Sequence, residues 1–305
     1  MEKIHPAFSS KNIAVCFSAN DKYAPLLATT IASIIYNSSK ENNYDIVVLT
    51  TGISDENKTK LMTQFAEHPN FSLRFVNVGA YVYGYSFYIE SDLTNTKYSD
   101  EIYFRVLVPT LFENYSKVVF LDADLVVRDD IAKLYNTDIG ENLVGAVRDY
   151  EGIANCYNNN YERTKYRINE IGIKNFEDYF ISGVMIINID EFNKSFESKT
   201  LLDLAVSKDW KQYDQDLFNY ICKGKAKIID AEWDFVEDID GIFQSMPEHL
   251  FREYVASEKN PKIIHYSANR KPWLKIDSKY NDDFWKYARL TKYNDYLISL
   301  KAKYE

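Results

Sequence analysis

Hydrophobic and polar positions along the first quarter of the chain predict strands and helices in turn. Continuous apolar runs, which are typical of buried strands, occur at residues 12–18 and 45–50, and residues 71–78 alternate like a third strand. Apolar residues at helical spacing predict an intervening helix at 23–36, and Ser54 is a cap for a second helix expected at 55–66. Because continuous apolar strands alternate with helices, the pattern predicts an α/β fold with a parallel sheet covered by helices.

The rest of the chain continues this alternation. Apolar blocks predict strands at residues 117–121, 125–127, 142–147, 183–189, 225–230 and 262–265. Helices are expected at 101–112 up to Pro109, at 201–206, at 214–222 and, as one or two amphipathic helices, after Asp282. Polar, tyrosine-rich stretches predict irregular segments at 81–99 and around 155–160. The longer one fits a lid or acceptor wall as well as a packed surface excursion.

Composition excludes several classes of function. The formal net charge of −9 argues against general binding to nucleic-acid backbones. No apolar run approaches the ~20 residues that span a bilayer, and residues 1–6 lack the apolar core of a secretory signal. Three scattered cysteines favour a reducing cytoplasm over a disulfide framework, with Cys16 expected in the core.

The most informative motif is an acidic couplet between two strand-like blocks. Asp122 and Asp124 interrupt the apolar run KVVFLDADLVV at residues 117–127. Burying an unpaired carboxylate is costly, so the couplet is expected at a strand end, facing a cleft and a cation. The pairs at 214–216 and 238–240 lack such flanks. The alternative is that the couplet caps a helix at 129–131.

Other polar groups follow predicted strands in the same way. Parallel α/β sheets place sites at the carboxyl ends of strands, and candidate ends occur at residues 17–21, 121–124, 147–149 and 264–266. Asp122, Asp124 and His265 would supply two hard oxygens and one imidazole. This set suits Mn²⁺ or Mg²⁺ better than structural zinc and leaves coordination positions open for phosphate oxygens.

Six segments together resemble glycosyltransferase family 8, which contains glycogenin and bacterial lipopolysaccharide galactosyl- and glucosyltransferases. They are, in chain order, FSANDKYAPLLATTIASI, YFRVLVPTLF, KVVFLDADLVVRDDI, ISGVMIINID, YDQDLFN and IIHYSANRKPW, and they span about residues 12–273. The resemblance implies a GT-A fold, in which helices flank a Rossmann-like mixed, mostly parallel sheet. It implies a catalytic domain at 1–273 and a helical extension at 274–305 packed on it.

The same resemblance implies metal-dependent, retaining transfer of glucose or galactose from a UDP-sugar to a saccharide or lipid-linked acceptor. The expected setting is cytoplasmic synthesis of cell-envelope polysaccharide. Carried over by motif, Mn²⁺ (or Mg²⁺) would be held by Asp122, Asp124 and His265. Nucleotide and diphosphate would meet Ser18, Asn20, Tyr23, Ala123, Ala268 and Lys271, with Tyr23 stacked on uracil. Donor sugar and catalysis would involve Arg105, Asp149, Asp214 and Gln215.

Three positions depart from the family pattern. Asn20 stands where Asp is usual, Ala268 where Gly is usual, and Ile181 where the strand motif has Asn. Ile181 cannot replace the hydrogen bonds of an amide, which leaves donor choice and turnover open. No carboxylate can be placed opposite the leaving group, and the amide of Gln215 is a poor nucleophile, so same-face attack is favoured.

Simpler interpretations stand beside these assignments. Arg105 could form a surface ion pair, Asp149 a turn, Asp214 a helix cap, and Lys271 could be solvated. The aromatic and basic stretch 284–303 could dock on an anionic membrane, although its acidic residues favour a helix packed on the domain. The alternative functions are a haloacid-dehalogenase-like phosphatase and a non-catalytic sugar-nucleotide or glycan-binding relative.

Overall fold

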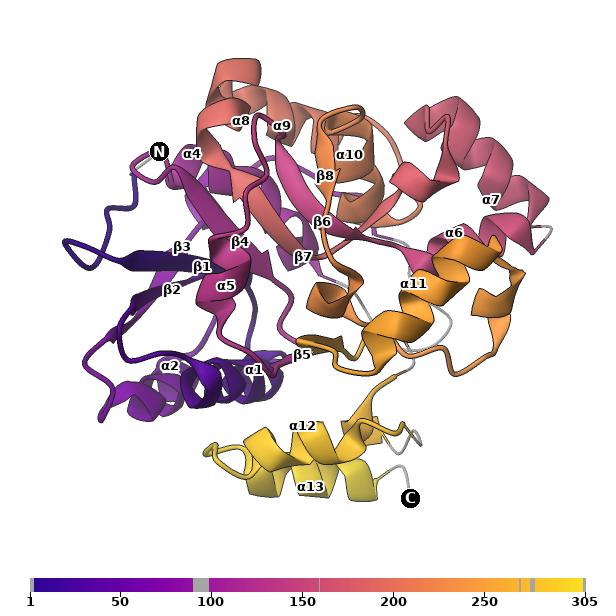
Figure 1. Ribbon diagram of the computed structural model, residues 1–305. Helices are drawn as coiled ribbons and strands as arrows, with labels where there is room; N and C mark the ends of the chain where they lie inside the picture. The colour runs from indigo at the N-terminus through magenta and orange to yellow at the C-terminus, as the bar shows by residue number, and fades with distance from the viewer. Residues whose placement is uncertain (1–2, 90–98, 159, 269, 275–277, 304–305) are drawn as a thin grey trace.

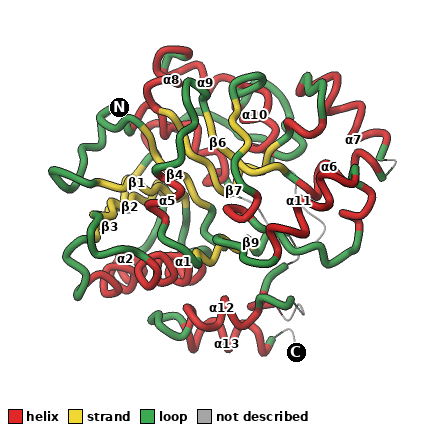
Figure 2. Tube along the Cα trace, viewed as in Figure 1, coloured by secondary structure: helices red, strands yellow, loops and turns green. Residues whose placement is uncertain are grey.

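A mixed, mostly parallel sheet lies at the centre of the computed structural model, which describes residues 3–89, 99–158, 160–268, 270–274 and 278–303 (Figure 2). Among these residues the sheet has seven strands in the order β3-β2-β1-β4-β7-β6-β8. They are β1 (Asn12–Ser18), β2 (Asn43–Thr50), β3 (Phe71–Asn77), β4 (Lys117–Leu121), β6 (Val144–Arg148), β7 (Phe180–Asn188) and β8 (Ala226–Ile228). The expected α/β architecture is confirmed.

The direction of β7 determines which residues meet at the functional edge. β1 pairs with β2 and β4 in parallel, whereas β7 is antiparallel to both β4 and β6. β4 and β6 therefore end at the same edge at which β7 begins. Residues 180–183, at the start of β7, consequently face the carboxyl ends of its two neighbours.

A second, two-stranded sheet joins distant parts of the sequence. β5 (Leu125–Val127) pairs antiparallel with β9 (Ile263–His265), so that Leu125 lies opposite His265. The predicted strand at 262–265 is confirmed, but it belongs to this small sheet and not to the central one. Because β5 follows Asp124 directly, this pairing brings His265 to the acidic couplet.

Helices cover both faces of the central sheet and enclose two hydrophobic cores (Figure 1). The first core includes residues from α1 (Ala24–Asn37), α2 (Asp55–Met62), α5 (Ile131–Tyr135), α6 (Tyr150–Tyr157), α11 (Glu248–Glu258), α12 (Asn281–Ala288) and α13 (Asn294–Ala302). The second includes residues from α4 (Val108–Leu111), α7 (Tyr161–Tyr166), α8 (Ile189–Ser195), α9 (Ser198–Ala205) and α10 (Tyr213–Ile221). In β4, Val119 and Leu121 join the first core, while Val118 and Phe120 join the second. Burial on both faces explains the continuous apolar runs.

Short helical turns connect these elements. The turn α3 (Gly79–Val82) follows β3. The 3₁₀ turns are η1 (Thr63–Phe65), η2 (Asp100–Leu107), η4 (Phe176–Asp178), η5 (Ala231–Asp234), η6 (Ile242–Ser245) and η7 (Pro272–Leu274). A π-helical turn, η3 (Arg167–Ile171), continues α7. The predicted cap at Ser54 is confirmed, because its side chain accepts from the Asn57 N–H at 3.3 Å.

Two of the predicted segments differ in structure. The segment around 155–160 is a loop only in part: residues 155–157 belong to α6, whereas Asn158 and Asn160 lie between α6 and α7, and residue 159 lies outside the described residues. The expected helix at 101–112 is 3₁₀ up to Leu107 and then α-helical, with Pro109 in its first turn, where a missing N–H costs nothing. Of the irregular segment 81–99, residues 83–89 are irregular and 90–98 lie outside the described residues.

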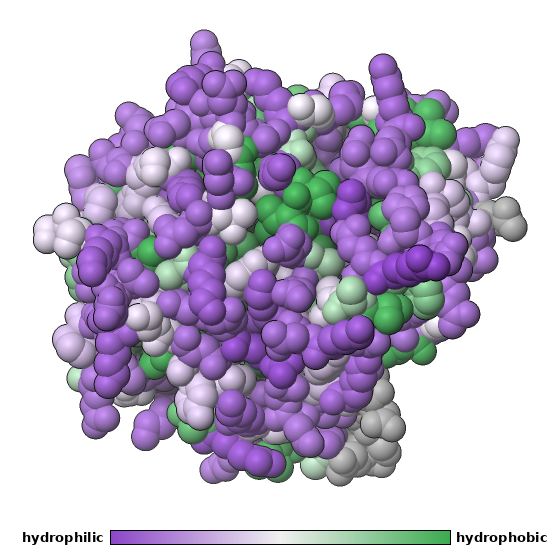
Figure 3. Space-filling view, viewed as in Figure 1, coloured by the Kyte–Doolittle hydropathy of each residue, from purple (hydrophilic) through white to green (hydrophobic). Residues whose placement is uncertain are grey.

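α12 packs against α1, and α13 packs against η7 (Figure 1). The Asn37 Nδ2 group donates to the Tyr287 hydroxyl at 2.9 Å, and the Lys286 ammonium lies 4.4 Å from the centre of the Tyr36 ring. The helical C-terminal segment is confirmed, whereas a domain boundary at 273/274 stays a prediction. None of the described helices is long and apolar enough to cross a membrane. The face in Figure 3 is mostly hydrophilic, with small separate apolar areas.

Candidate functional site

A cavity of about 630 Å³ opens where β1, β4 and β6 end and β7 begins. The structure brings all of the predicted site residues to its wall, although they come from distant parts of the chain. They are Ser18, Asn20, Tyr23, Arg105, Asp122, Ala123, Asp124, Asp149, Asp214, Gln215, His265, Ala268 and Lys271.

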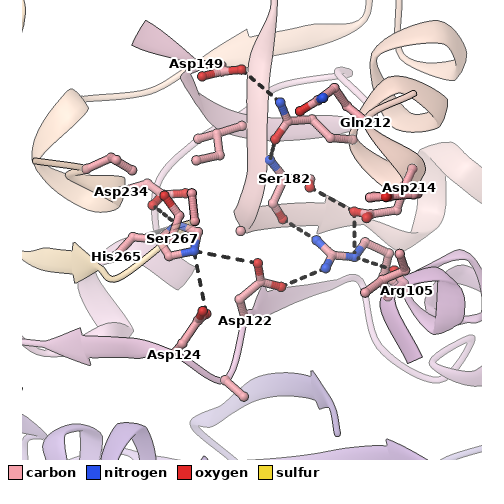
Figure 4. Close-up of a pocket in the computed structure, with 18 of the residues that line it drawn as sticks. Arg105, Asp122, Asp124, Asp149, Ser182, Gln212, Asp214, Asp234, His265 and Ser267 are labelled. Carbon is pink, nitrogen blue, oxygen red and sulfur yellow. Dashed lines mark hydrogen bonds and ion pairs between the residues drawn. The ribbon is translucent and has the colours of Figure 1, made fainter. Parts of the chain in front are cut away.

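Asp122, Asp124 and His265 form a cluster of possible metal ligands. One ligand atom from each lies within 4.8 Å of the others, and no second group of three such side chains occurs in the part of the chain that the structure describes. His265 Nε2 lies 3.8 Å from Asp122 Oδ2 and 3.6 Å from Asp124 Oδ1 (Figure 4). The capping alternative for the couplet is wrong, because Asp130 caps α5 by accepting from the Ala132 N–H at 2.9 Å.

Asp234, a residue that the sequence analysis missed, orients the imidazole. Its Oδ1 lies 2.9 Å from His265 Nδ1, which leaves Nε2 facing the couplet (Figure 4). Burial disfavours the charged imidazole, but Asp234 and Asp124 outweigh burial and raise the pKa of His265 to about 10. A carboxylate on the far nitrogen is the usual support for a metal-binding histidine. In the sequence, Asp234 stands out only as a single acidic residue between the aromatic residues Trp233 and Phe235.

Lys271 approaches the couplet from the segment after β9. Its ammonium forms an ion pair with Asp124, so the solvated alternative is wrong. Burial alone would raise the pKa of Asp124, yet Lys271 and His265 hold it well below its usual range. Ala268, in the same segment, has φ of +48°, a left-handed conformation that favours glycine. This segment therefore presents a cation to the cavity from a strained turn.

Arg105 is buried and links two acidic residues of the cavity. Its guanidinium donates to Asp122 Oδ1 at 2.7 Å and lies 3.0 Å from Asp214 Oδ2 (Figure 4). It also donates to the Ser182 carbonyl at 2.5 Å and lies 4.4 Å from the centre of the Phe120 ring. The surface ion-pair alternative is therefore wrong.

Asp214 is held on two sides at the start of α10. Besides Arg105, the Ser182 hydroxyl donates to Asp214 Oδ2 at 2.8 Å. Burial raises the pKa of Asp214 to about 6, despite the opposing charge of Arg105. The capping alternative is wrong, because the N-cap position belongs to Gln212 and α10 already begins at Tyr213.

Both ends of the Gln215 amide are engaged. Its Nε2 donates to Asp149 Oδ2 at 2.9 Å, and its Oε1 accepts from the Ser182 N–H at 3.2 Å. Asp149 is not the turn residue of the alternative interpretation but the N-cap of α6, and its Oδ1 accepts from the Gly152 N–H at 2.8 Å. Its second oxygen faces Gln215, so the same carboxylate both caps α6 and lines the cavity.

Another part of the cavity wall is formed by the turn between β1 and α1. Asn20 Oδ1 accepts from the backbone N–H groups of Lys22 at 3.0 Å and Tyr23 at 3.3 Å. Its Nδ2 donates to Ser99 Oγ at 3.0 Å and to Glu101 Oε2 at 3.3 Å. The half-buried ring of Tyr23 lies beside this network on the cavity wall. The turn thus offers a flat aromatic face next to polar groups, a combination that suits a base.

Comparison with known proteins identifies the class and then the family. A solved structure described as the WbbM bifunctional glycosyltransferase matches with a TM-score of 0.87 and 29% identity over 98% of this chain, which spans about half (53%) of that protein. Galactosyltransferase LgtC, solved with donor and acceptor sugar analogues, matches with a TM-score of 0.72 and 23% identity over 92% of this chain and 96% of LgtC. The architecture is the GT-A fold of glycosyltransferases.

Sequence comparison gives the family. The sequence profile described as glycosyl transferase family 8 matches residues 14–277, so the chain belongs to this family of glycosyltransferases. A putative glycosyltransferase of Haemophilus influenzae is 28% identical over 89% of this chain and 76% of its own. The lipopolysaccharide 1,2-glucosyltransferase of Escherichia coli is 21% identical over 88% of this chain and 74% of its own. The resemblance inferred from the motifs is confirmed.

Proposed function

We propose that this glycosyltransferase moves glucose or galactose from a UDP-sugar to a glycan or glycolipid acceptor, with retained configuration at the anomeric carbon. One observation carries the proposal. A ligand set for a divalent cation, Asp122, Asp124 and His265, shares one cavity with the cations Arg105 and Lys271. A sugar diphosphate needs such an arrangement, because its negative charge increases as the sugar leaves.

The residues present fit Mn²⁺ or Mg²⁺. Two carboxylates and an imidazole whose far nitrogen is already held by Asp234 match the preferences of these ions. When bound, the ion would neutralise charge on the diphosphate. The protein itself contributes the Lys271 ammonium beside Asp124 and the Arg105 guanidinium beside Asp122 and Asp214.

The contacts around Gln215 support same-face attack. Its amide cannot ionise, its nitrogen is committed to Asp149, and its oxygen already accepts from the Ser182 N–H. In the proposed step the bond from the anomeric carbon to the phosphate oxygen breaks. The acceptor oxygen forms a bond on the same face, and its proton goes to the departing phosphate oxygen. A glycosyl adduct on Gln215 or Asp149 in a mass spectrum would contradict this step.

The relatives support the proposed class of acceptor. Similarity to a lipopolysaccharide glucosyltransferase supports a saccharide or lipid-linked saccharide acceptor and a role in cell-envelope polysaccharide synthesis. We place the protein in the cytoplasm, with peripheral contact at the inner membrane face as the alternative role of α12 and α13. Exposed Leu290, Tyr296 and Ile298 lie in this region, and co-sedimentation with anionic vesicles tests that contact.

The decisive experiment is a donor screen. The protein is incubated with a panel of UDP-hexoses, Mn²⁺ and saccharide acceptors, and released UDP is measured. Metal-dependent UDP release supports the proposal. Binding without turnover on every donor would favour the non-catalytic relative that Ile181 keeps open. Phosphate release from aryl phosphates would favour the phosphatase, which the family membership already argues against.

A substitution in the cluster tests the metal assignment. Asp124→Asn removes one carboxylate and should abolish the Mn²⁺-dependent part of UDP binding, measured by titration calorimetry. Asp129→Asn is the matched control, because Asp129 lies five positions along the chain and pairs with Lys133 outside the cavity. Unchanged titration heats for Asp124→Asn would refute the metal assignment.

A further inference from the structure

Arg167 is a buried cation directly behind Asp149, at the start of the π-helical turn η3. It is 1% exposed and does not line the cavity. Its guanidinium donates to the Gly152 carbonyl at 2.6 Å, lies 3.5 Å from Asp149 Oδ2, and stacks 3.6 Å from the centre of the Tyr179 ring. The sequence pattern predicts a loop nearby and indicates no role for Arg167.

The contacts of Arg167 lead to Gln215 through one carboxylate oxygen. Asp149 Oδ2 faces Arg167 and also accepts from Gln215 Nε2 at 2.9 Å. Asp149 is mostly buried, and Arg167 is the only cation that pairs with it among the described residues. Removing that cation would leave a buried carboxylate without its counter-charge, which is strongly unfavourable. The carboxylate would then shift or recruit water.

Such a shift would loosen the amide of Gln215. With Asp149 in place, the amide nitrogen donates to Asp149 Oδ2 at 2.9 Å and to the Tyr179 hydroxyl at 3.4 Å, and the amide oxygen accepts from the Ser182 N–H. An amide that has lost the shorter of its two acceptor contacts is held less firmly and can rotate, which exchanges its donor and acceptor ends. Gln215 lines the cavity, so its orientation decides which atom it presents to a bound sugar.

The packing shows that this arrangement is tightly built. A Cβ atom on Gly152 would lie 2.7 Å from Asp149 Cγ, and closer still to the Asp149 carboxylate oxygen and to the Arg167 guanidinium. Only glycine therefore allows α6 to begin so near the pair. On the other side, Tyr179 is itself fixed, because its hydroxyl donates to Asp216 at 2.6 Å.

We infer that Arg167 is a positioning residue for sugar transfer, acting through Asp149 to fix the amide of Gln215. The inference rests on the proposed function. The competing explanation is a structural role, in which Arg167 only ties α6 to the Tyr179 region. The two differ in one respect: positioning requires that the effect of Arg167 on turnover disappear when Asp149 has no charge.

A double-mutant cycle measures this dependence. UDP release at saturating donor and Mn²⁺ is compared for wild type, Arg167→Gln, Asp149→Asn and the double variant, below the melting temperature of each. We expect Arg167→Gln alone to lower kcat about tenfold or more, with the donor KM changed less than about threefold. In the Asp149→Asn background the same substitution should change kcat less than about threefold, because no buried charge is left unpaired.

Two further variants keep the test independent of folding. Lys165→Gln removes a positive charge from exposed Lys165 on α7 and should leave kcat unchanged. Arg167→Lys retains the charge and should recover part of the lost kcat. An equal loss of kcat from Arg167→Gln in both backgrounds, or loss of melting temperature alone, would overturn the inference. An active wild type with that result refutes only the positioning role, whereas a wild type that releases no UDP refutes the proposed function as well.

Discussion

Gly183 lies where β7 passes the acidic cluster, and its replacement by alanine would reach that cluster without altering any ligand. A Cβ atom on Gly183 would stand 2.7 Å from His265 Nδ1, closer still to His265 Cε1, and 3.2 Å from Asp122 Oδ2. Side-chain contacts normally begin at 3.4 Å. The imidazole must therefore move away by at least about 0.7 Å, the difference between the 2.7 Å to Nδ1 and the ordinary contact distance of 3.4 Å.

The retreat has two consequences of different size. The ring is buried and hydrogen-bonded to Asp234, so overpacking should lower the free energy of unfolding by about 1–3 kcal/mol and the Tm by a few degrees. Displacing a ligand by most of an ångström should also weaken Mn²⁺ binding about tenfold or more, as loss of a ligand's supporting contact does.

The two consequences are separated by a matched control. Gly145→Ala, on β6, would place a Cβ atom 2.6 Å from Ile139 Cγ2 in the first hydrophobic core, away from the cavity. Thermal melts of both variants, with calorimetric titration of Mn²⁺ in the presence of UDP, give stability and affinity in the same samples. We expect similar losses of Tm, and a loss of Mn²⁺ affinity for Gly183→Ala alone. Unchanged affinity for Gly183→Ala would refute the assignment of His265 as a ligand.

Two further predictions concern donor choice and pH. Ile181→Asn places an amide on the cavity wall and should change the order of preference among UDP-hexoses, and an identical donor profile would show that this position is irrelevant. Burial raises the pKa of Asp214 to about 6 in the folded state, above its ordinary value of 3.8. The folded state therefore binds this proton more tightly than the unfolded state does. The resulting contribution to the free energy of unfolding is complete below pH 4 and is lost as pH rises through 6. In thermal melts without added metal, wild type should therefore lose Tm relative to Asp214→Asn between pH 4 and 7; a constant difference would contradict this pKa.

Much of the fold could be predicted because its signals are local. The buried strands at 12–18 and 117–121 are apolar on both faces, so each appears in the sequence as a run of consecutive apolar residues. The helical part of the segment around 155–160 was missed for the same reason. α6 buries few side chains, among them Ile153, and α7 buries only Tyr166, so polar residues dominate the local pattern. Pro109 also reads as a helix end in sequence, although it lies in the first turn of α4.

The residues of the site also fall into two groups, those that local sequence motifs predict and those that only contacts between distant segments reveal. The acidic couplet between apolar blocks and the ordered motifs identified the family and the residues that meet at the cavity, since these features lie in short segments of sequence. Only the tertiary structure revealed Asp234 behind His265 and Arg167 behind Asp149, because each partner comes from a segment with no pattern of its own. It also decided that β7 runs against its neighbours and that β9 pairs with β5. Counter-charges and strand directions depend on contacts between distant residues, and those contacts exist only once the chain has folded.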